Sequence, residues 1–371
     1  MKSGRNIQAI AQQVYSTKTL KDDLVFPGDI LNLSPDGETL ASFNHDAPAN
    51  VGTGYFPVVN DANHSFSMSD IAHGALSRRL EIPKAYYDRM RNDHPGLLAE
   101  NVNTWMRDSS NHLIRTVGNP DGSPPTCRAI LSEKYKIIDN DQVMEKLFPV
   151  LHEQQSMEIV SAEITPTKFY LKARFPELER EIGLNDAIQS GVVISNSEVG
   201  FGSTEVSMLI YRLRCLNGMI LADSAFKARR VHIGAAMKTD ENFRIIASQE
   251  TLRLQDEAFY AGLADIVRAA ADPDVFQSAA ATLQDAADQK IDGTIQETVQ
   301  NVTKHFSLTE SEGKSVLDNL IRDGEYSKWG LANAVTRTAN ETDSYDRATE
   351  LERLGGKVIE LKENDWMRLA A

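Results

Sequence analysis

A glycine-rich turn between two runs of β-favouring residues constrains the fold of this chain more than any other feature. The runs cover residues 191–195 and 204–214, and the turn covers 198–203. Such runs around a glycine turn predict two paired antiparallel strands. Side chains two residues apart on a strand share a face, so we expect Arg212 and Arg214 to lie together. Two guanidinium groups on one face are suited to binding phosphate.

The rest of the chain extends this pattern into an α+β fold. Residues 159–164 and 169–175 alternate as a hairpin, and helical periodicity takes over from about residue 242. We therefore expect a central antiparallel β-meander with packed helices, followed by a mostly helical C-terminal region. The expected domains are an irregular or β N-terminal lobe (1–66), an α+β core with a basic meander (67–241) and an acidic helical region (242–371).

Helix boundaries in the C-terminal third carry clear local signals. Thr309 and Glu312 form a capping box before an apolar stripe, and Ser344 is the expected N-cap of a last helix that ends at Gly355. Residues 269–288 are rich in alanine and aspartate, which predicts either a surface helix or a flexible arm. Helices therefore account for most of this third of the chain.

The charge is strongly negative but unevenly spread. The net charge is −14, and residues 241–371 hold 14 Lys and Arg against 24 Asp and Glu. Residues 207–238 hold six basic side chains against one acid, Asp223. This basic strip fits either a groove for a polyanion or a solvated face. Its members are Arg212, Arg214, Lys227, Arg229, Arg230 and Lys238.

Several classes of protein are disfavoured by missing motifs. There is no apolar run long enough for a membrane span and no secretory signal core, so we expect a cytoplasmic protein. Cys127 and Cys215 are too few for a disulfide framework or a zinc site. Complete dinucleotide and phosphate-loop motifs are missing. We expect no cofactor and no metal, and a role other than catalysis is favoured.

Aromatic residues beside basic ones are typical of single-strand binders, in which bases stack on aromatic rings. Tyr211 precedes the Arg212 and Arg214 pair, and Tyr86 and Tyr87 follow two arginines. The alternative is that these rings only pack in the interior.

Several separate segments resemble one protein family. They are Leu80–Met90, Asn103–Trp105, Ile130–Tyr135, Asn196–Met219, Trp329–Thr336 and Ser344–Glu352. Together they resemble phage- and plasmid-encoded proteins grouped as domain of unknown function 932, over roughly residues 70–370. The motif residues that carry the resemblance are Asn196, Ser197, Glu198, Gly200, Asn217, Gly218, Trp329, Asn333 and Thr336.

That context implies a role in handling invading or replicating DNA. The order of strands and helices also resembles ATP-independent single-strand annealing recombinases, which form rings or filaments. This resemblance implies a single-stranded DNA partner, a homo-oligomer and a basic groove. The residues of that groove would be Arg212, Arg214, Lys227, Arg229 and Arg230, with Tyr211 as a stacking ring.

Two other functions remain open. The acidity suits a factor that binds and inhibits a basic host enzyme. Carboxylates such as Glu198, Glu205 and Asp223 suit an Mg²⁺-dependent enzyme on nucleic acid, although Glu198 could equally satisfy turn donors or an arginine. Trp329, Asn333 and Thr336 share one helix face, which predicts either a ligand-binding face or a helix docked on the sheet.

Overall fold

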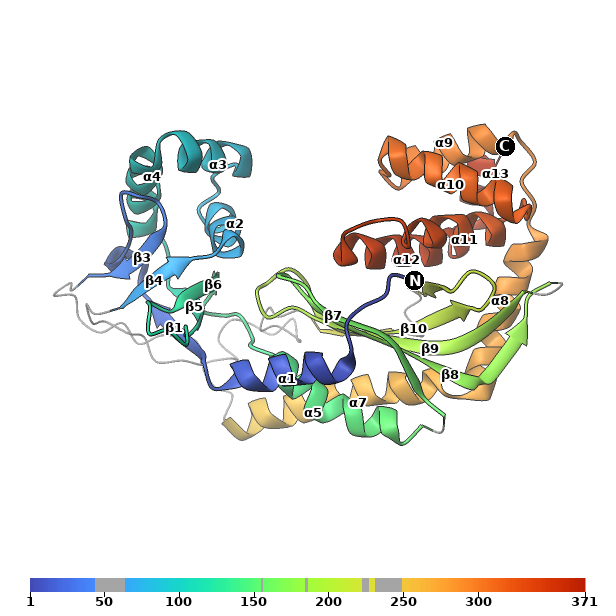
Figure 1. Cartoon of the computed structure of the whole chain (residues 1–371), viewed down its shortest axis with the longest axis horizontal. Coiled ribbons are helices and arrows are strands. Elements are labelled where there is room, and N and C mark those ends of the chain that lie inside the picture. The colour runs from blue at the N-terminus through green and yellow to red at the C-terminus, as the bar shows by residue number, and fades with distance from the viewer. Residues whose placement is uncertain (44–63, 155, 184–185, 222–226, 231–248, 371) are drawn as a thin grey trace.

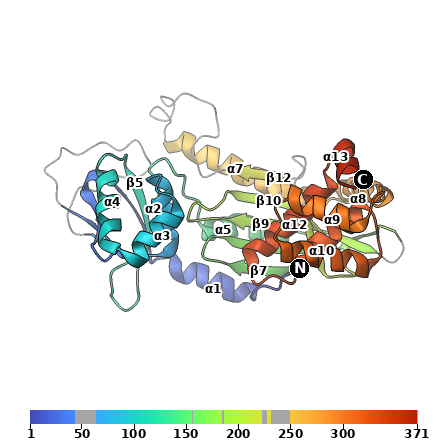
Figure 2. The same cartoon turned by 90° about the horizontal axis from the view of Figure 1, so that it is seen from above.

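Two β-sheets, each with its own hydrophobic core, lie side by side along the long axis of the molecule (Figures 1 and 2). The computed structural model describes residues 1–43, 64–154, 156–183, 186–221, 227–230 and 249–370. We call the two halves the N-terminal lobe and the C-terminal lobe, and define each below by its elements. In the described part of the chain, no helix combines the length and the apolar character needed to cross a membrane.

The N-terminal lobe consists of a six-stranded sheet with helices packed on it. The strand order is β1-β5-β6-β4-β3-β2, with β4 and β6 parallel and the other neighbours antiparallel. The apolar sides of the helices bury Leu76, Tyr87 and Val102 with Phe26 of the sheet. Its elements are β1 (Lys21–Phe26), a short 3-10 helix (Gly28–Ile30), β2 (Leu31–Leu33), β3 (Thr39–Ser42), β4 (Ser65–Met68), α2 (Asp70–Arg79), α3 (Lys84–Asp93), α4 (Pro95–Arg107), β5 (His112–Val117) and β6 (Thr126–Ser132).

The C-terminal lobe is built on an antiparallel meander in the order β11-β10-β9-β8-β7. Strand β12 pairs with the first half of β10, and β11 pairs with its second half. The strands are β7 (Glu158–Ile164), β8 (Phe169–Glu181), β9 (Ala187–Asn196), β10 (Thr204–Arg212), β11 (Asn217–Ile220) and β12 (Lys227–Arg230).

Helices cover both faces of this meander. In Figure 1, α1, α5 and α7 lie below the sheet, and α11 and α12 lie above it. Successive side chains of each strand point to opposite faces of the sheet and pack against these two helix layers, so the sheet is buried on both sides. The helices of this lobe are α1 (Ile7–Lys18), α5 (Asn140–His152), α7 (Gln249–Ala270), α8 (Pro273–Asp288), α9 (Ile295–His305), α10 (Glu310–Asp323), α11 (Lys328–Thr338), α12 (Tyr345–Ile359) and α13 (Glu363–Ala370).

The chain enters the C-terminal lobe twice. Ile10 and Val14 of α1 belong to the core of the C-terminal lobe, so the N-terminal lobe is inserted between α1 and α5. The domain boundary expected at residue 66 falls within β4, and the sheet of the N-terminal lobe takes strands from both sides of it. The boundary expected at residue 241 lies outside the described residues.

The α+β fold class predicted from the sequence is confirmed, as is the antiparallel meander with a helical C-terminal region. The capping box of Thr309 and Glu312 is present, and Ser344 caps α12. The expected end of that helix at Gly355 is wrong, because α12 runs on to Ile359. Gly355 and Gly356 serve close packing instead: a Cβ on Gly356 would lie 2.0 Å from the carbonyl oxygen of Ile220.

A fully buried ion pair joins the meander to α12. Lys172 of β8 and Glu352 of α12 are both inaccessible to solvent, and the Nζ of Lys172 lies 2.5 Å from a carboxylate oxygen of Glu352. The same Nζ donates to the hydroxyl of Thr349 at 3.1 Å and lies 4.8 Å from the ring centroid of Tyr345. Since a buried charge is costly without its partner, the two residues stabilise the fold only together.

We therefore expect Lys172→Met to lower the free energy of unfolding by about 3–5 kcal/mol, because it strands the Glu352 carboxylate. The double variant Lys172→Met, Glu352→Leu should recover most of this loss, since an apolar pair replaces both charges. Urea unfolding of the three proteins measures both effects. The control is Lys290→Met, which breaks an exposed ion pair with Glu325 and should cost less than about 1 kcal/mol. A cost of that size for Lys172→Met would contradict this account.

His73 makes the fold sensitive to acid. Its ring is fully buried in α2, its Nδ1 lies 2.8 Å from the hydroxyl of Tyr87, and burial together with the charge of Arg91 lowers its pKa to about 4. The unfolded chain takes up a proton near pH 6.5, but the folded chain does so only near pH 4, so stability falls as the pH drops between these values. We expect His73→Gln to flatten this decline by up to about 1.4 kcal/mol per pH unit, measured by urea unfolding from pH 7 to 4.5. Parallel curves for the two proteins would show that His73 does not cause it.

Candidate functional site

Glu198 lies at the junction of the two lobes, where cations from the N-terminal lobe surround it. It follows β9 in the tight turn to β10 and is nearly buried. The Nζ of Lys21 lies 2.7 Å from one carboxylate oxygen, and the guanidinium of Arg128 pairs with the other. The backbone N–H of Asn140, at the start of α5, donates to the same carboxylate at 2.8 Å. The carboxylate therefore occupies the anion position of a helix N-terminus.

The charges around Glu198 fix its protonation state. Burial by itself would raise the pKa of this carboxyl, but the charges of Arg128 and Lys21 and the Asn140 N–H outweigh burial and lower it to about 2. A carboxylate held ionised in this way is a poor general base, since such a base works best with a pKa near the operating pH. The structure thus favours the alternative in which the Glu198 carboxylate accepts hydrogen bonds from an arginine and from a backbone N–H group.

A second buried cation strengthens the same junction. The guanidinium of Arg115 in β5 donates to both carboxylate oxygens of Asp23 at 2.7 and 3.0 Å, and to Asp139 at 2.7 Å. Its remaining nitrogen donates to the backbone carbonyl of Glu198 at 2.7 Å. The hydroxyl of Tyr135 donates to the carbonyl of Ser197 at 3.0 Å. The turn after β9 is therefore held by both side chain and backbone contacts to the N-terminal lobe.

The neighbouring motif residues shape this turn. Asn196 is buried, and its side-chain amide nitrogen donates to the side chain of Asn140 at 2.9 Å. The side-chain oxygen Oδ1 of Asn196 accepts from the hydroxyl of Thr204 at 2.7 Å. The hydroxyl of Ser197 accepts from the N–H of Phe201 at 2.9 Å. Gly200 has a φ of +80°, and a Cβ there would lie 2.6 Å from the side chain of Leu131. These motif residues build the turn that presents Glu198 to the N-terminal lobe.

Arg212 is not available to a ligand, which corrects the expected basic face. It lies at the end of β10 with only 2% of its surface exposed. Its guanidinium makes two bonds to Asp186, at 2.5 and 2.9 Å, and a third to Asp323 at 3.0 Å. Both carboxylates come from distant parts of the sequence, so the pairing could not be read from the local pattern. Arg212 is therefore the cation of a buried ion-pair network with Asp186 and Asp323.

The other residues expected beside Arg212 do not form a shared face with it. Strand β10 ends at Arg212, so Arg214 lies beyond the strand in an exposed turn. Tyr211 is 8% exposed, and the guanidinium of Arg174 lies 5.2 Å from its ring centroid. The expected pair of arginines on one strand face is therefore wrong, and Tyr211, expected as a stacking ring, is nearly covered.

The basic residues of β12 are placed only by their backbone. Lys227 pairs with Ser207, Arg229 with Glu205 and Arg230 with Thr204 of β10. Their side chains lie outside the described part of the structure, and so does Asp223. Their expected role in binding DNA stays a prediction.

The motif residues of α11 form a second buried network, and they hold the helix to the edge of the sheet. The indole N–H of Trp329 donates to Asp186 at 2.9 Å, which ties the helix to the Arg212 ion pair. Asn217 of β11 donates to the hydroxyl of Thr336 at 2.5 Å, and Asn333 donates to the carbonyl of Trp329 at 2.9 Å. Gly218, beside Asn217, packs against the side chain of Leu209. The docked-helix alternative is thus the one observed.

A cavity of about 260 Å³ opens at the lobe junction, and we call it the junction cavity. Two cations line it beside Glu198. The Nη1 of Arg128 pairs with Glu198. The Nε and Nη2 of Arg128 are buried and have no acceptor among the described residues. The side chain of Lys168 packs against Gly202: a Cβ on Gly202 would lie 2.9 Å from the Cε of Lys168. The Nζ of Lys168 makes no hydrogen bond within the described part of the chain. The remaining lining includes Ser69, Ile71, Asn140, Thr165 and Thr167.

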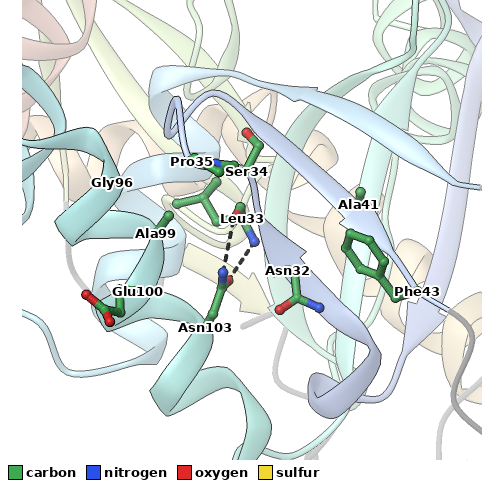
Figure 3. Close-up of a pocket in the computed structure, with 10 residues that line it drawn as sticks. All are labelled: Asn32, Leu33, Ser34, Pro35, Ala41, Phe43, Gly96, Ala99, Glu100 and Asn103. Atoms are coloured by element: carbon green, nitrogen blue, oxygen red, sulfur yellow. Dashed lines mark hydrogen bonds between the residues drawn. The ribbon is translucent and has the colours of Figure 1, made fainter.

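A larger cavity of about 540 Å³ lies against α4 in the N-terminal lobe (Figure 3). The side chain of Asn103 makes two hydrogen bonds to the backbone of Leu33, at 2.7 and 3.0 Å. The oxygen and the nitrogen of its amide are therefore both engaged within the fold. Among the described residues that line this cavity, Glu100 is the one with an ionisable side chain, and none of them is a cation.

Two of the carboxylates considered as magnesium ligands, Glu198 and Glu205, are engaged with cations and hydroxyl or backbone donors. Glu205 pairs with Arg353 and accepts from the hydroxyl of Ser207, and Glu198 is saturated as described above. Over the residues that the structure describes, no group of three potential metal ligands comes together. Cys127 is buried, and burial raises the pKa of its thiol to about 12.

The chain belongs to the family described as Domain of unknown function (DUF932), whose model matches residues 129–354, more than half of the sequence. The motif residues around Glu198 and around Trp329 fall within the match, whereas Lys21, Arg115 and Arg128, which contact Glu198, lie before it. The segments at 80–90 and 103–105 that contributed to the resemblance lie before it. No curated protein and no solved structure matches the chain.

Replacing Glu198 tests the junction. We expect Glu198→Gln to lower the free energy of unfolding by about 3–5 kcal/mol, because it leaves Lys21 and Arg128 buried without their anion. The matched control is Glu158→Gln, which breaks a more exposed pair with Arg174 and should cost less than about 1 kcal/mol. Equal midpoints in urea would contradict a stabilising role for Glu198.

Proposed function

We propose that this protein binds single-stranded DNA without a nucleotide cofactor, and that the DNA backbone enters at the junction cavity. The observation that carries the proposal is the pair of cations that line that cavity, Arg128 and Lys168, each of which has side-chain donors without an acceptor among the described residues. A buried guanidinium nitrogen without an acceptor is costly, and an anion in the cavity would relieve that cost.

The charge of the junction cavity suits a phosphodiester. Arg128 and Lys168 line the cavity with two positive charges, and the negative charge of Glu198 is offset by Lys21 behind it, so a positive surplus remains. Each phosphodiester carries a single negative charge. The cavity also borders the N-terminus of α2, where Ser69 is the N-cap, and helix N-termini favour anions.

The proposed biological role is annealing of complementary DNA, as the resemblance to single-strand annealing recombinases suggests. Binding through the backbone leaves the edges of the bases free for a second strand, and it needs no hydrolysis. The acidic helical region, in which α8 and α10 carry a net negative charge, would limit non-specific binding elsewhere on the molecule by repelling phosphate.

The second candidate function is a protein that binds and inhibits a basic host enzyme. The net charge of −14 favours it, since an acidic surface attracts a basic partner. The two proposals differ in the sign of the partner's charge, so oligonucleotide binding separates them.

We expect Lys168→Gln to weaken binding of a single-stranded oligonucleotide at low salt by several-fold, independent of base sequence. Because one phosphate contact is lost, the slope of log affinity against log salt should decrease in magnitude by about 0.7. Fluorescence anisotropy with labelled oligothymidylate at several salt concentrations measures both.

The control is Lys290→Gln, an exposed lysine of the C-terminal lobe that should leave affinity and slope unchanged. Lys168 makes no ion pair within the described structure, so its replacement should not unfold the protein. An unchanged affinity in Lys168→Gln, with the fold intact by circular dichroism, would remove the junction cavity as the phosphate site. Absence of any oligonucleotide binding would favour the inhibitor.

A further inference from the structure

A second concavity of the N-terminal lobe is lined by exposed aromatic rings, and we call it the aromatic groove. It has a volume of about 570 Å³ and lies between the end of α2, the start of α3 and the end of α4. Tyr86 and Trp105 line it with 47% and 56% of their surfaces exposed. Large aromatic side chains left open in one groove mark a surface that binds something planar or apolar.

The exposure of Trp105 is unusual within this chain. The two other tryptophans, Trp329 and Trp366, are 1% and 3% exposed and belong to the core of the C-terminal lobe. Trp105 follows Val102 by three residues and precedes Met106 by one, yet those two neighbours are fully buried. The indole therefore stands on the outer face of α4, where the core does not need it.

Hydrogen-bonding groups lie in the same groove. Arg79 donates through Nε to His112 at 2.8 Å and through Nη2 to the carbonyl of Asn111 at 3.2 Å, which fixes its plane. Its Nη1 makes no hydrogen bond among the described residues. The side-chain amide of Asn101 also lines the groove. A planar ligand with polar edges fits rings beside a spare guanidinium donor and an amide.

The aromatic groove and the junction cavity lie at opposite ends of α2. Ser69 and Ile71 line the junction cavity, and Arg79 and Leu80 line the aromatic groove. The ten residues of α2 rise by about 15 Å, which is about four nucleotides at a stacked rise of about 3.4 Å. Near the end of the helix, Arg78 is exposed, and its guanidinium lies 4.3 Å from the ring centroid of Phe201 in the turn after β9. One short strand of nucleic acid can therefore reach both sites.

We propose that the aromatic groove is a base-binding site, in which nucleobases of single-stranded nucleic acid stack on Trp105 and Tyr86. This inference rests on the proposed function and adds the recognition of bases to that of phosphates. Stacking engages the face of a base and leaves its hydrogen-bonding edge accessible, so it is compatible with annealing.

Tryptophan fluorescence tests the base-binding site directly. Oligothymidylate should quench the emission of the wild-type protein, because a stacked base lies on the one exposed indole. Trp105→Phe should remove the quenching, and Trp366→Phe should retain it. Trp105→Ala should weaken oligonucleotide binding by about 5-fold to 150-fold, since one stacked base is lost. Trp105 is exposed, so this variant should fold normally, which circular dichroism checks.

An abasic oligonucleotide, with sugar and phosphate but no bases, separates the two proposals. It should bind with the salt dependence of the junction cavity and leave Trp105 emission unchanged. If oligothymidylate binds by anisotropy without quenching Trp105, the base-binding site is wrong and the phosphate site stands.

A free mononucleotide covers the opposite case. Adenosine monophosphate at millimolar concentration should quench Trp105 in the wild type and in Lys168→Gln, because its base needs only the aromatic groove. Quenching by the mononucleotide without oligonucleotide binding would overturn the proposed function and keep the base site. If nothing quenches Trp105, and Trp105→Ala instead reduces the particle size in light scattering, the groove binds a second copy of this chain and the base-binding site is wrong.

Discussion

The compensation of one buried carboxylate by cations from another lobe governs this structure. Glu198 belongs to a turn of the C-terminal lobe, but Lys21 and Arg128 that neutralise it come from strands β1 and β6 of the N-terminal lobe. An ionised group in a low-dielectric interior is tolerated only with such partners, so the lobes must meet in one arrangement. The position of the junction cavity and the contact of Arg78 with Phe201 both follow from that arrangement.

The same principle explains why so few cations remain for a ligand. Arg115, Lys172 and Arg212 are buried, and each is matched by carboxylates from distant elements. Motif residues such as Asn196 and Trp329 hold these networks in place, so the family resemblance largely reports how the two lobes are built. Within the described residues, unpartnered donors line the junction cavity, and two exposed aromatic rings line the aromatic groove.

Local patterns anticipated the elements of this fold better than its site. The hairpin turn at 198–203, the capping box at Thr309 and the cap at Ser344 involve residues close in sequence, and the structure has all three. No local pattern predicts Arg128 and Lys168 as site residues, because neither lies in a basic run and only the fold brings them to one cavity. Tyr86 was noted as an aromatic beside basic residues, but its neighbour in the groove, Trp105, lies on another helix.

The sequence by itself determined two hairpins of the meander, the caps and the acidity of the helical region, because propensity, turn chemistry and charge act over a few residues. It could not determine which charged side chains face a ligand. Asp186 lies 26 residues from Arg212, and Asp323 lies 111 residues from it. Only the tertiary structure brings those carboxylates to the guanidinium. Ion pairing depends on distance in space, so Arg212 is a structural residue, while the ammonium group of Lys168 has no ion-pair partner among the described residues.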